Sequence, residues 1–228
     1  MIKKILVGLF IVIGGFFAFA ATRPGTYHVE RSTKVDAPAS LVFAQLDDFK
    51  SWAAWSPWEK MDPNMQKTFT GPPEGVGASY SWQGNDKVGK GKMTITGSQP
   101  VTGIKYKLEF IEPFAAVAES DFSLVPQGDQ AVKVVWAMDG TNDLMGKVFG
   151  IFMNMDAAIG ADFERGLTSL KAIAEGEAKM QFEQAEAAKA RAAADAVAKV
   201  QAEATAAAVA AEAAATAAAD AKKGKRKP

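Results

Sequence analysis

The 228-residue sequence contains no cysteine and a single histidine, His28. The absence of cysteine excludes disulfides, thiolate zinc sites and cysteine nucleophiles, and it is compatible with an oxidising compartment. A Ser-His-Asp triad would have to use His28, and a metal site built from several histidines is excluded. We therefore predict no metal and no cofactor, and we interpret His28 as a partly exposed strand residue.

The sequence also lacks net charge, because 26 basic residues balance 26 acidic ones. Residues 24–174 are weakly acidic and lack the clustered Lys and Arg that phosphate contacts need, so we expect no specific nucleic acid partner. Basic residues crowd the carboxy terminus instead, where they could contact an anionic surface or simply solubilise the end of a helix. This basic tip comprises Lys222, Lys223, Lys225, Arg226 and Lys227.

A long apolar run is present at the amino terminus, where residues 5–21 carry no charge behind Lys3 and Lys4. These seventeen residues would span about 26 Å as a helix, slightly less than a hydrocarbon core of ~30 Å. We predict a retained transmembrane anchor over residues 1–23, and the alternative is a signal peptide with its small-residue cleavage site at residues 18–20. The two lysines predict a cytoplasmic amino terminus, so the rest of the chain lies outside the cytoplasm, anchored at a bacterial inner membrane or secreted after cleavage.

Alanine makes up about half of the carboxy-terminal region, interspersed with Glu, Lys and Gln, which are strong helix formers. Neither proline nor glycine occurs from Glu177 to Lys223. The few large apolar residues form no sustained heptad, so the pattern is coiled-coil-like in composition only. We predict a solvated Ala-rich helical tail over residues 175–228, either a spacer for the basic tip or a dispensable low-complexity extension.

The middle of the chain, residues 24–174, is predicted to be an α+β domain. A strand over residues 27–35 precedes a helix that begins near Asp36, its predicted N-cap, with Pro38 in the first turn. Turn residues then separate several short strands, which is the pattern of an antiparallel meander. The predicted strands cover residues 66–70, 78–84, 89–98, 103–110, 116–125 and 131–139.

Alternation assigns the faces of this sheet. In residues 103–110 the apolar side chains share one face, while Lys105, Lys107 and Glu109 share the other, so the apolar face needs a cover. Residues 143–174 supply it, because apolar residues recur there at spacings of three and four, as in one long amphipathic helix. The predicted order is strand, helices, six strands and long helix.

Five segments of this region together resemble one family. They read DAPASLVFAQLDDFKSWAAWSPW, GPPEGVGASYSWQG, VGKGKMTI, LEFIEPF and MDAAIGADFERGLTSLK. Over about residues 27–174 the chain is similar to the SRPBCC superfamily, the helix-grip proteins related to START, Bet v 1 and polyketide cyclase/dehydrase proteins. The resemblance implies a curved antiparallel sheet around a long C-terminal helix, with an apolar cavity between them. It implies a lipid, sterol or polyketide ligand, with catalysis in only some members, and it places no catalytic motif on numbered positions here.

The predicted function is binding of a hydrophobic small molecule or lipid in this cavity by a membrane-anchored, non-catalytic domain. Two alternatives stay open: a polyketide cyclase/dehydrase-like enzyme, which requires an acid or tyrosine in the cavity, and an envelope interaction protein with a closed cavity and a functional tail. Aromatic and methionine side chains are the predicted lining. They are Trp55, Trp58, Tyr80, Trp82, Tyr106, Phe122, Trp136, Met138, Phe152 and Met155.

Scattered acids bear on the enzyme alternative, because a carboxyl group in the cavity could act as general acid or base. Glu119 and Asp121 are the strongest candidates, since they lie in an otherwise apolar run. The other candidates are Glu59, Asp62 and Asp139.

The segment WAAWSPW, residues 52–58, holds three of the five tryptophans around Pro57. Pro57 should end the preceding helix. We predict a bend between the first helices and the strands, with Trp55 and Trp58 pointing into the cavity and at least one indole structural.

Overall fold

The computed structural model describes residues 2–224 of the chain, with side chains up to residue 218. The chain divides into two units, residues 1–178 and 179–228. In the second unit the chain is helical as far as Gly224, and its side chains are exposed through residue 218. Lys225, Arg226 and Lys227 of the predicted basic tip lie outside the described residues.

The first unit is built on one seven-stranded antiparallel sheet with the strand order β1-β7-β6-β5-β4-β3-β2. Each predicted strand is present, and the chain forms a meander from β2 to β7 before β7 pairs with β1. The strands are β1 (Thr26–Val35), β2 (Gln66–Thr70), β3 (Ser79–Gln83), β4 (Lys90–Gln99), β5 (Gly103–Glu112), β6 (Ala116–Pro126) and β7 (Val132–Thr141).

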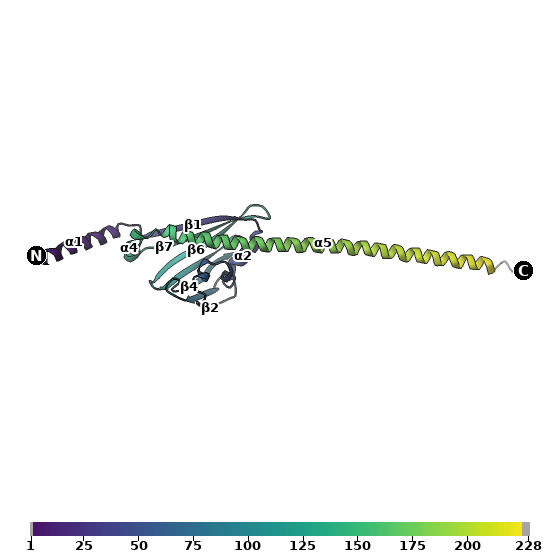
Figure 1. The fold of residues 1–228 in the computed structure, drawn as a ribbon, viewed down its shortest axis with the longest axis horizontal. Coiled ribbons are helices and arrows are strands. Elements are labelled where there is room, and N and C mark those ends of the chain that lie inside the picture. The colour runs from purple at the N-terminus through teal and green to yellow at the C-terminus, as the bar shows by residue number, and fades with distance from the viewer. Residues whose placement is uncertain (1, 225–228) are drawn as a thin grey trace. The chain divides into compact units, whose positions relative to one another are not determined.

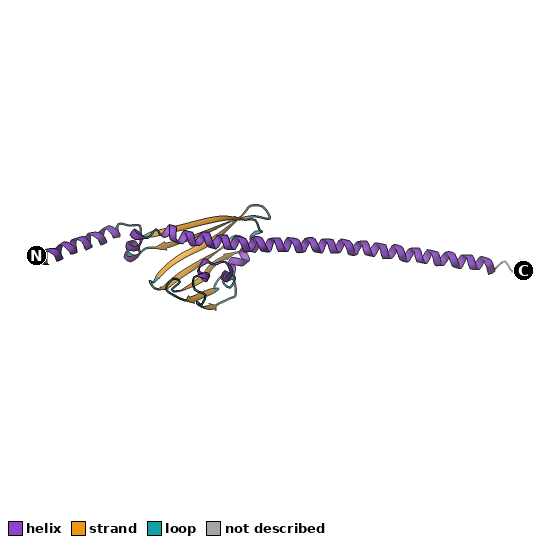
Figure 2. Cartoon of the chain, in the orientation of Figure 1, coloured by secondary structure: helices purple, strands orange, loops and turns teal. Residues whose placement is uncertain are grey.

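The long helix α5 (Met155–Gly224) crosses the inner face of the curved sheet with its first turns (Figures 1 and 2). Its apolar stripe meets the inner face of the sheet at β7, where the Trp136 ring stacks on Phe163 with centroids 4.0 Å apart and planes 6° apart. Gly166 permits this approach, since a Cβ there would lie 2.8 Å from the indole. A curved sheet packed around a long helix confirms the predicted α+β helix-grip fold.

Short helices between β1 and β2 cover part of the same face. The predicted N-cap at Asp36 is wrong, because the first of them begins at Ala39 and Pro38 occupies the N-cap position without a side-chain hydrogen bond. Asp36 instead pairs with Lys34 at 2.7 Å, and its N–H donates to Glu175. The helices are α2 (Ala39–Asp47), α3 (Trp52–Trp55) and the 3-10 helix η1 (Pro57–Lys60).

The single helix predicted over residues 143–174 is wrong, because the chain forms two helices there. The first, α4 (Leu144–Phe152), ends at Met153, whose backbone is extended, and α5 follows after a bend of 79°. The Asn154 side chain accepts a hydrogen bond from Ala157 N at 3.1 Å and so satisfies the first turn of α5. This local cap starts a new helix although the apolar pattern continues, and α5 then runs past residue 174 without a break.

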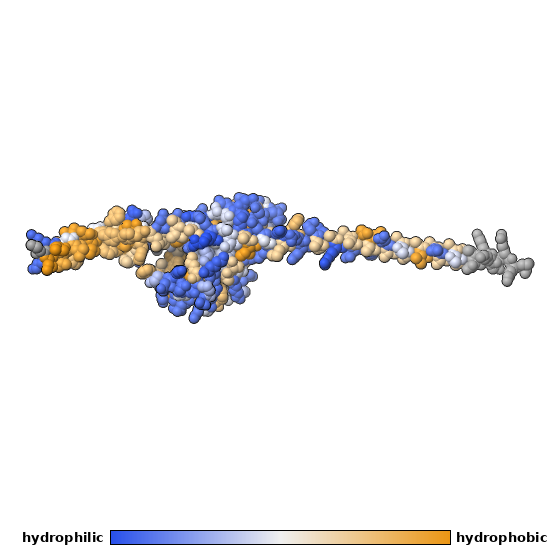
Figure 3. Space-filling view, viewed as in Figure 1, coloured by the Kyte–Doolittle hydropathy of each residue, from blue (hydrophilic) through white to orange (hydrophobic). Residues whose placement is uncertain are grey.

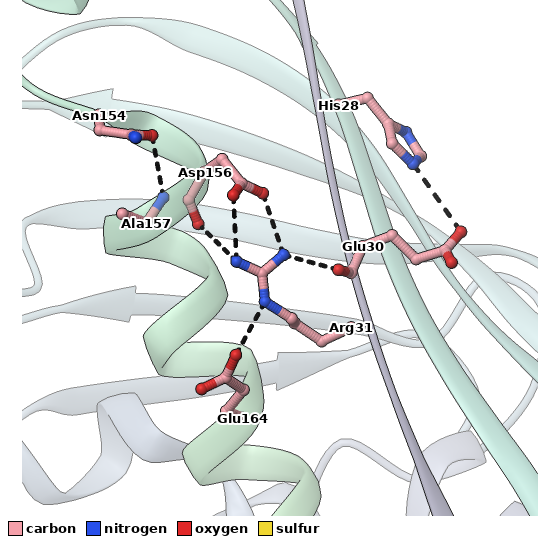
Figure 4. Close-up of polar contacts among 7 residues, drawn as sticks. All are labelled: His28, Glu30, Arg31, Asn154, Asp156, Ala157 and Glu164. Atoms are coloured by element: carbon pink, nitrogen blue, oxygen red, sulfur yellow. Dashed lines mark hydrogen bonds and ion pairs between the residues drawn. The ribbon is translucent and has the colours of Figure 1, made fainter.

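Arg31 of β1 fixes the start of α5 (Figure 4). Its guanidinium donates to Asp156 Oδ1 at 3.0 Å and to Glu164 Oε1 at 2.9 Å. The side chain crosses α5 at Gly160, where a Cβ would lie 2.0 Å from Nη2. Hydrogen bonding to Arg31 lowers the pKa of Asp156 below its ordinary value. Charged hydrogen bonds therefore position the first turns of α5 against the sheet.

The amino-terminal helix α1 (Ile2–Ala21) is long and apolar enough to cross a membrane, and 6% of its most apolar stretch is buried within the structure. Its 20 residues correspond to about 30 Å, the thickness of a hydrocarbon core. A signal sequence has the same properties, so both predicted roles of this segment fit the helix.

Candidate ligand cavity

A cavity of about 220 Å³ lies between the inner face of the sheet and the first turns of α5. Strands β1, β3, β4, β5 and β7 contribute lining residues from the sheet, and η1 and α5 contribute others. Its polar members are Ser56, Glu59, Lys87 and Asp162. The apolar lining comprises Tyr27, Trp52, Trp58, Met65, Tyr80, Trp82, Val88, Met93, Tyr106, Leu108, Phe110, Met138, Met155 and Ile159.

Two glycines let large rings lie flat along the wall of this cavity. Trp82 lies over its cross-strand partner Gly91, where a Cβ would come within 2.4 Å of the indole. Tyr27 lies in the same way over Gly140, where a Cβ would come within 2.3 Å of the ring. A side chain at either glycine would push its aromatic neighbour away from the sheet and into the space that both rings line.

An acid and a phenol form a hydrogen-bonded polar pair in the largely apolar wall. The Tyr80 hydroxyl donates to Glu59 Oε1 at 3.1 Å, and the Lys67 ammonium pairs with Glu59 Oε2. Only 12% of the Glu59 side chain is exposed. Burial and the nearby carboxylate raise the pKa of Tyr80 far above its ordinary value, so the phenol remains a donor at neutral pH. Because a carboxylate has about four acceptor sites, Glu59 can accept a further hydrogen bond from a ligand.

The other four predicted acid–base candidates, Asp62, Glu119, Asp121 and Asp139, do not line the cavity. Asp62 is buried, but it accepts hydrogen bonds from the backbone of Asn64 and Asn85 at 3.0 and 2.7 Å and so fixes the loop that holds them. Glu119 and Asp121 lie on the outer face of β6, so the prediction that they are the strongest acid–base candidates is wrong. Within residues 2–224, no three His, Asp or Glu side chains are grouped so that they could hold a metal ion.

A tryptophan–tyrosine contact separates the cavity from the packed core. Trp136 Nε1 donates to the Tyr106 hydroxyl at 3.0 Å and to Ser120 Oγ at 3.2 Å. Tyr106 lines the cavity with its ring, and its complete burial raises the pKa of its phenol above the ordinary value. The buried indole N–H therefore has two acceptors at the point where the cavity meets the core.

Residues 26–175 match the family described as polyketide cyclase / dehydrase and lipid transport. The chain belongs to this family. The match covers the sheet, the cavity and the sheet-packed part of α5, while α1 and most of the Ala-rich tail lie outside it. No curated protein matches the chain.

Solved structures give similar folds at low identity. One is protein CV1439 from Chromobacterium violaceum, with 17% identity, 67% of this chain and 99% of that chain covered, and a TM-score of 0.46. Another is the Zhui aromatase/cyclase from Streptomyces sp. R1128, with 15% identity and a TM-score of 0.46. The match covers 66% of this chain and 94% of that chain. Membership of the polyketide cyclase / dehydrase and lipid transport family rests on the family match and not on these scores.

Six of the ten side chains predicted to line the cavity do lie in its wall. They come from η1, from three strands of the sheet (β3, β5 and β7) and from the first turn of α5, so residues far apart in the sequence meet at one end of the domain. These six are Trp58, Tyr80, Trp82, Tyr106, Met138 and Met155.

The other four predicted residues lie elsewhere. Trp55, Phe122 and Trp136 are completely or almost completely buried and pack against one another, with centroids of Phe122 and Trp136 4.6 Å apart. Phe152 is 77% exposed on α4. Of the two indoles expected to point inward from residues 52–58, Trp58 lines the cavity, whereas Trp55 belongs to the core and Trp52 takes its place in the wall.

Several lining residues were absent from the predicted set. Leu108 and Phe110 lie on the apolar face that alternation assigns in residues 103–110, so the same pattern could have named them, and Met93 is the cross-strand partner of Leu108. The sequence indicates Glu59 only as one of several scattered acids. Its place in the wall depends on the direction in which η1 leaves the tryptophan segment, which sequence periodicity does not specify.

Proposed function

We propose that the protein is a membrane-anchored domain that binds a hydrophobic small molecule or lipid, without catalysis, in the cavity between the sheet and α5. The observation that carries this proposal is the partly open cavity of about 220 Å³ with its apolar lining. Burial of apolar ligand surface would supply the affinity, and a few polar groups would orient the ligand. The lipid transport in the family description supports the same class of ligand.

The cavity volume limits the size of the ligand. At about 220 Å³ the space lies below the ~300–1,000 Å³ usual for drug-sized ligands and corresponds to the liquid volume of roughly seven water molecules. A ligand held here is therefore small, or it inserts one end, such as part of an acyl chain, and leaves the rest outside. The volume and the partial opening both disfavour the alternative of a closed cavity.

The polar pair suggests one more property of the ligand. Glu59 retains acceptor capacity beside Tyr80, whereas the surrounding wall is apolar. A ligand with a hydroxyl or amide donor next to an apolar body would satisfy both surfaces. A hydrocarbon without a donor would leave the carboxylate with only its protein partners, and should bind less tightly.

The anchor in this proposal is α1, which has a mean hydropathy of 2.3 in its most apolar stretch. Lys3 and Lys4 precede the uncharged run, so the domain is expected outside the cytoplasm. Intact mass measurement of the protein from membranes tests this part. Retention of residues 1–23 supports the anchor, whereas their loss supports a secreted protein made with a signal peptide.

Native mass spectrometry of the full chain, extracted from membranes into nanodiscs, tests ligand binding. We expect a bound non-protein mass in the wild type and in Val125→Phe, whose site is exposed on the outer face of β6. Leu108→Phe adds volume to the cavity wall and should reduce occupancy at least tenfold. A wild type that emerges empty and binds nothing from a panel of fatty acids, phospholipids and sterols would refute the proposal.

A second candidate function is a cyclase- or dehydrase-like reaction, which the Glu59–Tyr80 pair favours. The carboxylate could accept a proton, and the protonated phenol could stabilise an oxygen that gains negative charge. Comparison of the molecules bound to the wild type and to Glu59→Gln separates the two functions. A non-catalytic binder holds the same molecule in both, whereas an enzyme holds product in the wild type and unreacted substrate in the variant.

A further inference from the structure

One end of the domain carries large apolar side chains that the described part of the chain leaves exposed. Helix α4 contains no buried residue, although six of its nine residues are large and apolar. Phe152 is 77% exposed, and Lys147 is the only charged residue of the helix. A free surface helix normally buries its apolar side, so α4 needs an apolar partner.

The connection between β5 and β6 extends this surface. Ile111, Phe114 and Val117 are each about half exposed or more, at 49%, 61% and 49%. The Phe114 ring lies 5.4 Å from that of Phe149 on α4. We call residues 111–117 together with α4 the apolar end.

The apolar end is continuous with α1. The Phe16 ring of α1 lies 6.2 Å from Phe152, and the Lys147 ammonium donates to Ala21 O at 3.2 Å. Figure 3 shows apolar residues along α1 and on the part of the domain next to it. The helix proposed to cross the membrane therefore contacts the exposed apolar helix directly.

The tether between α1 and the sheet is too short to hold the domain away from a membrane. Only residues 22–25 separate α1 from β1, and four extended residues span at most about 14 Å. The apolar end lies where β1 begins and β7 ends, since Thr26 pairs with Thr141 just before α4. A bilayer that holds α1 thus lies next to this end.

The cavity is at the same end of the sheet. The deep wall of the cavity contains the buried residues Tyr106 and Trp52. The half-buried lining residues are Tyr27 near the start of β1, Phe110 near the end of β5 and Met155 at the start of α5. These half-buried residues adjoin α1, the β5–β6 connection and α4 in sequence. The opening of the cavity therefore lies beside the apolar end.

We propose that the apolar end docks into the interface of the bilayer that holds α1, so that the cavity opens toward lipid. This inference rests on the proposed anchor and ligand cavity. The apolar side chains of a helix that lies in the plane of a membrane interface are buried about 5–10 Å into the boundary between headgroups and acyl chains, which would cover the exposed side chains of α4. A hydrophobic ligand then passes between the bilayer and the cavity without crossing bulk water.

Site-directed spin labelling tests the docking on the full chain in vesicles of phosphatidylethanolamine and phosphatidylglycerol. Because the chain has no cysteine, Phe114→Cys and Phe152→Cys each provide a single labelling site. Val125→Cys, on the opposite end of the sheet and 51% exposed, is the matched control, and Phe10→Cys reports on α1. We expect labels at 10, 114 and 152 to collide preferentially with oxygen, and the label at 125 with a water-soluble nickel chelate.

Any other pattern of label accessibility contradicts either the docking alone or the docking together with the anchor. A lipid-like signal at 10 with water-like signals at 114 and 152 overturns the docking and leaves the anchor intact. A water-like signal at 10 overturns the anchor and the docking together, whereas ligand binding is still decided by the native mass measurement. Dipolar broadening between labels at 152 on two chains assigns the surface to a second copy and also overturns the docking.

Discussion

The indole N–H of Trp136 on β7 donates to the hydroxyl of Tyr106 on β5 at 3.0 Å, across the intervening strand β6. Ser120 of β6 lies between them and accepts from the same N–H at 3.2 Å. Three neighbouring strands are thus joined by side chains as well as by backbone hydrogen bonds. The contact lies where the cavity wall meets the aromatic core, so it stabilises both.

Substitution of this network gives a graded prediction. Tyr106→Phe leaves the Trp136 N–H bonded to Ser120, so the free energy of unfolding should fall by about 0.5–1.5 kcal/mol. Tyr106→Phe with Ser120→Ala leaves the buried N–H without an acceptor and should lower it by about 1–3 kcal/mol more. Denaturant unfolding of the full chain, followed by tryptophan fluorescence, measures both. Equal stability of the single and double variants would contradict the shared role of Ser120.

The Trp136–Phe163 stack should contribute strongly to the attachment of α5 to the sheet. Phe163 is fully buried, so Phe163→Ala removes a large ring and leaves a cavity, at a cost of about 3–5 kcal/mol in the free energy of unfolding. Phe182→Ala, at a site 67% exposed on the same helix, should change it by less than about 0.5 kcal/mol. Denaturant unfolding of each variant measures this difference as a shift of the midpoint, with the slope of the free energy of unfolding against denaturant concentration unchanged.

Acid should loosen the start of α5 in a specific pH range. Arg31 lowers the pKa of Asp156 in the folded protein below the ordinary aspartate value of 3.8. The ion pair therefore stabilises the folded protein above pH 3.8, and this stabilisation is lost as the pH falls through the lowered pKa of Asp156 in the folded protein. Amide hydrogen exchange in residues 155–165, corrected for the intrinsic rate, should accelerate as the pH falls below 3.8. Asp156→Asn should show a smaller change, whereas Asp195→Asn in the exposed part of α5 should behave as the wild type.

His28 offers a titration that can be read without overlap, because it is the only histidine. Its hydrogen bond with Asp139, at 2.8 Å, raises its pKa above the ordinary value of 6.5. The stabilisation of the folded protein by this hydrogen bond is therefore complete below pH 6.5, and it is lost as the pH rises through the raised pKa of His28 in the folded protein. NMR of the imidazole should give a pKa above 6.5 in the wild type and a lower one in Asp139→Asn. An unchanged value in the variant would show that Asp139 does not hold the proton on the ring.

The sequence predicted the sheet because alternation is a local property. The inner and outer faces of β5 follow directly from it, as does the apolar stripe that packs α5 on the sheet. The break between α4 and α5 was missed because the apolar spacing continues through residues 153–154. Asn154, followed by Asp156, is an N-cap signature, but it stands among apolar residues that suggested a continuous helix.

The cavity was harder to predict than the face it belongs to. Alternation shows that Trp136 and Tyr106 point inward, but it does not show that Phe163 fills the space beside one of them while the space beside the other is empty. That difference depends on where α5 crosses the sheet, which Arg31 and Gly160 determine from elements 125 or more residues apart. The place of Glu59 in the cavity wall was not predicted for a related reason. The short helix η1 has no periodicity from which the direction of the Glu59 side chain could be inferred.

Gly91 and Gly140 influence the shape of the cavity from outside its lining, which matters for the proposed ligand binding. Neither glycine lines the cavity, but each determines how far an aromatic ring can retreat from it. Selection for a smaller or larger ligand could therefore act on these two positions without altering any group that touches the ligand. In the design of a variant pocket, substitution of Gly91 would shift the ring of Trp82, and substitution of Gly140 would shift the ring of Tyr27.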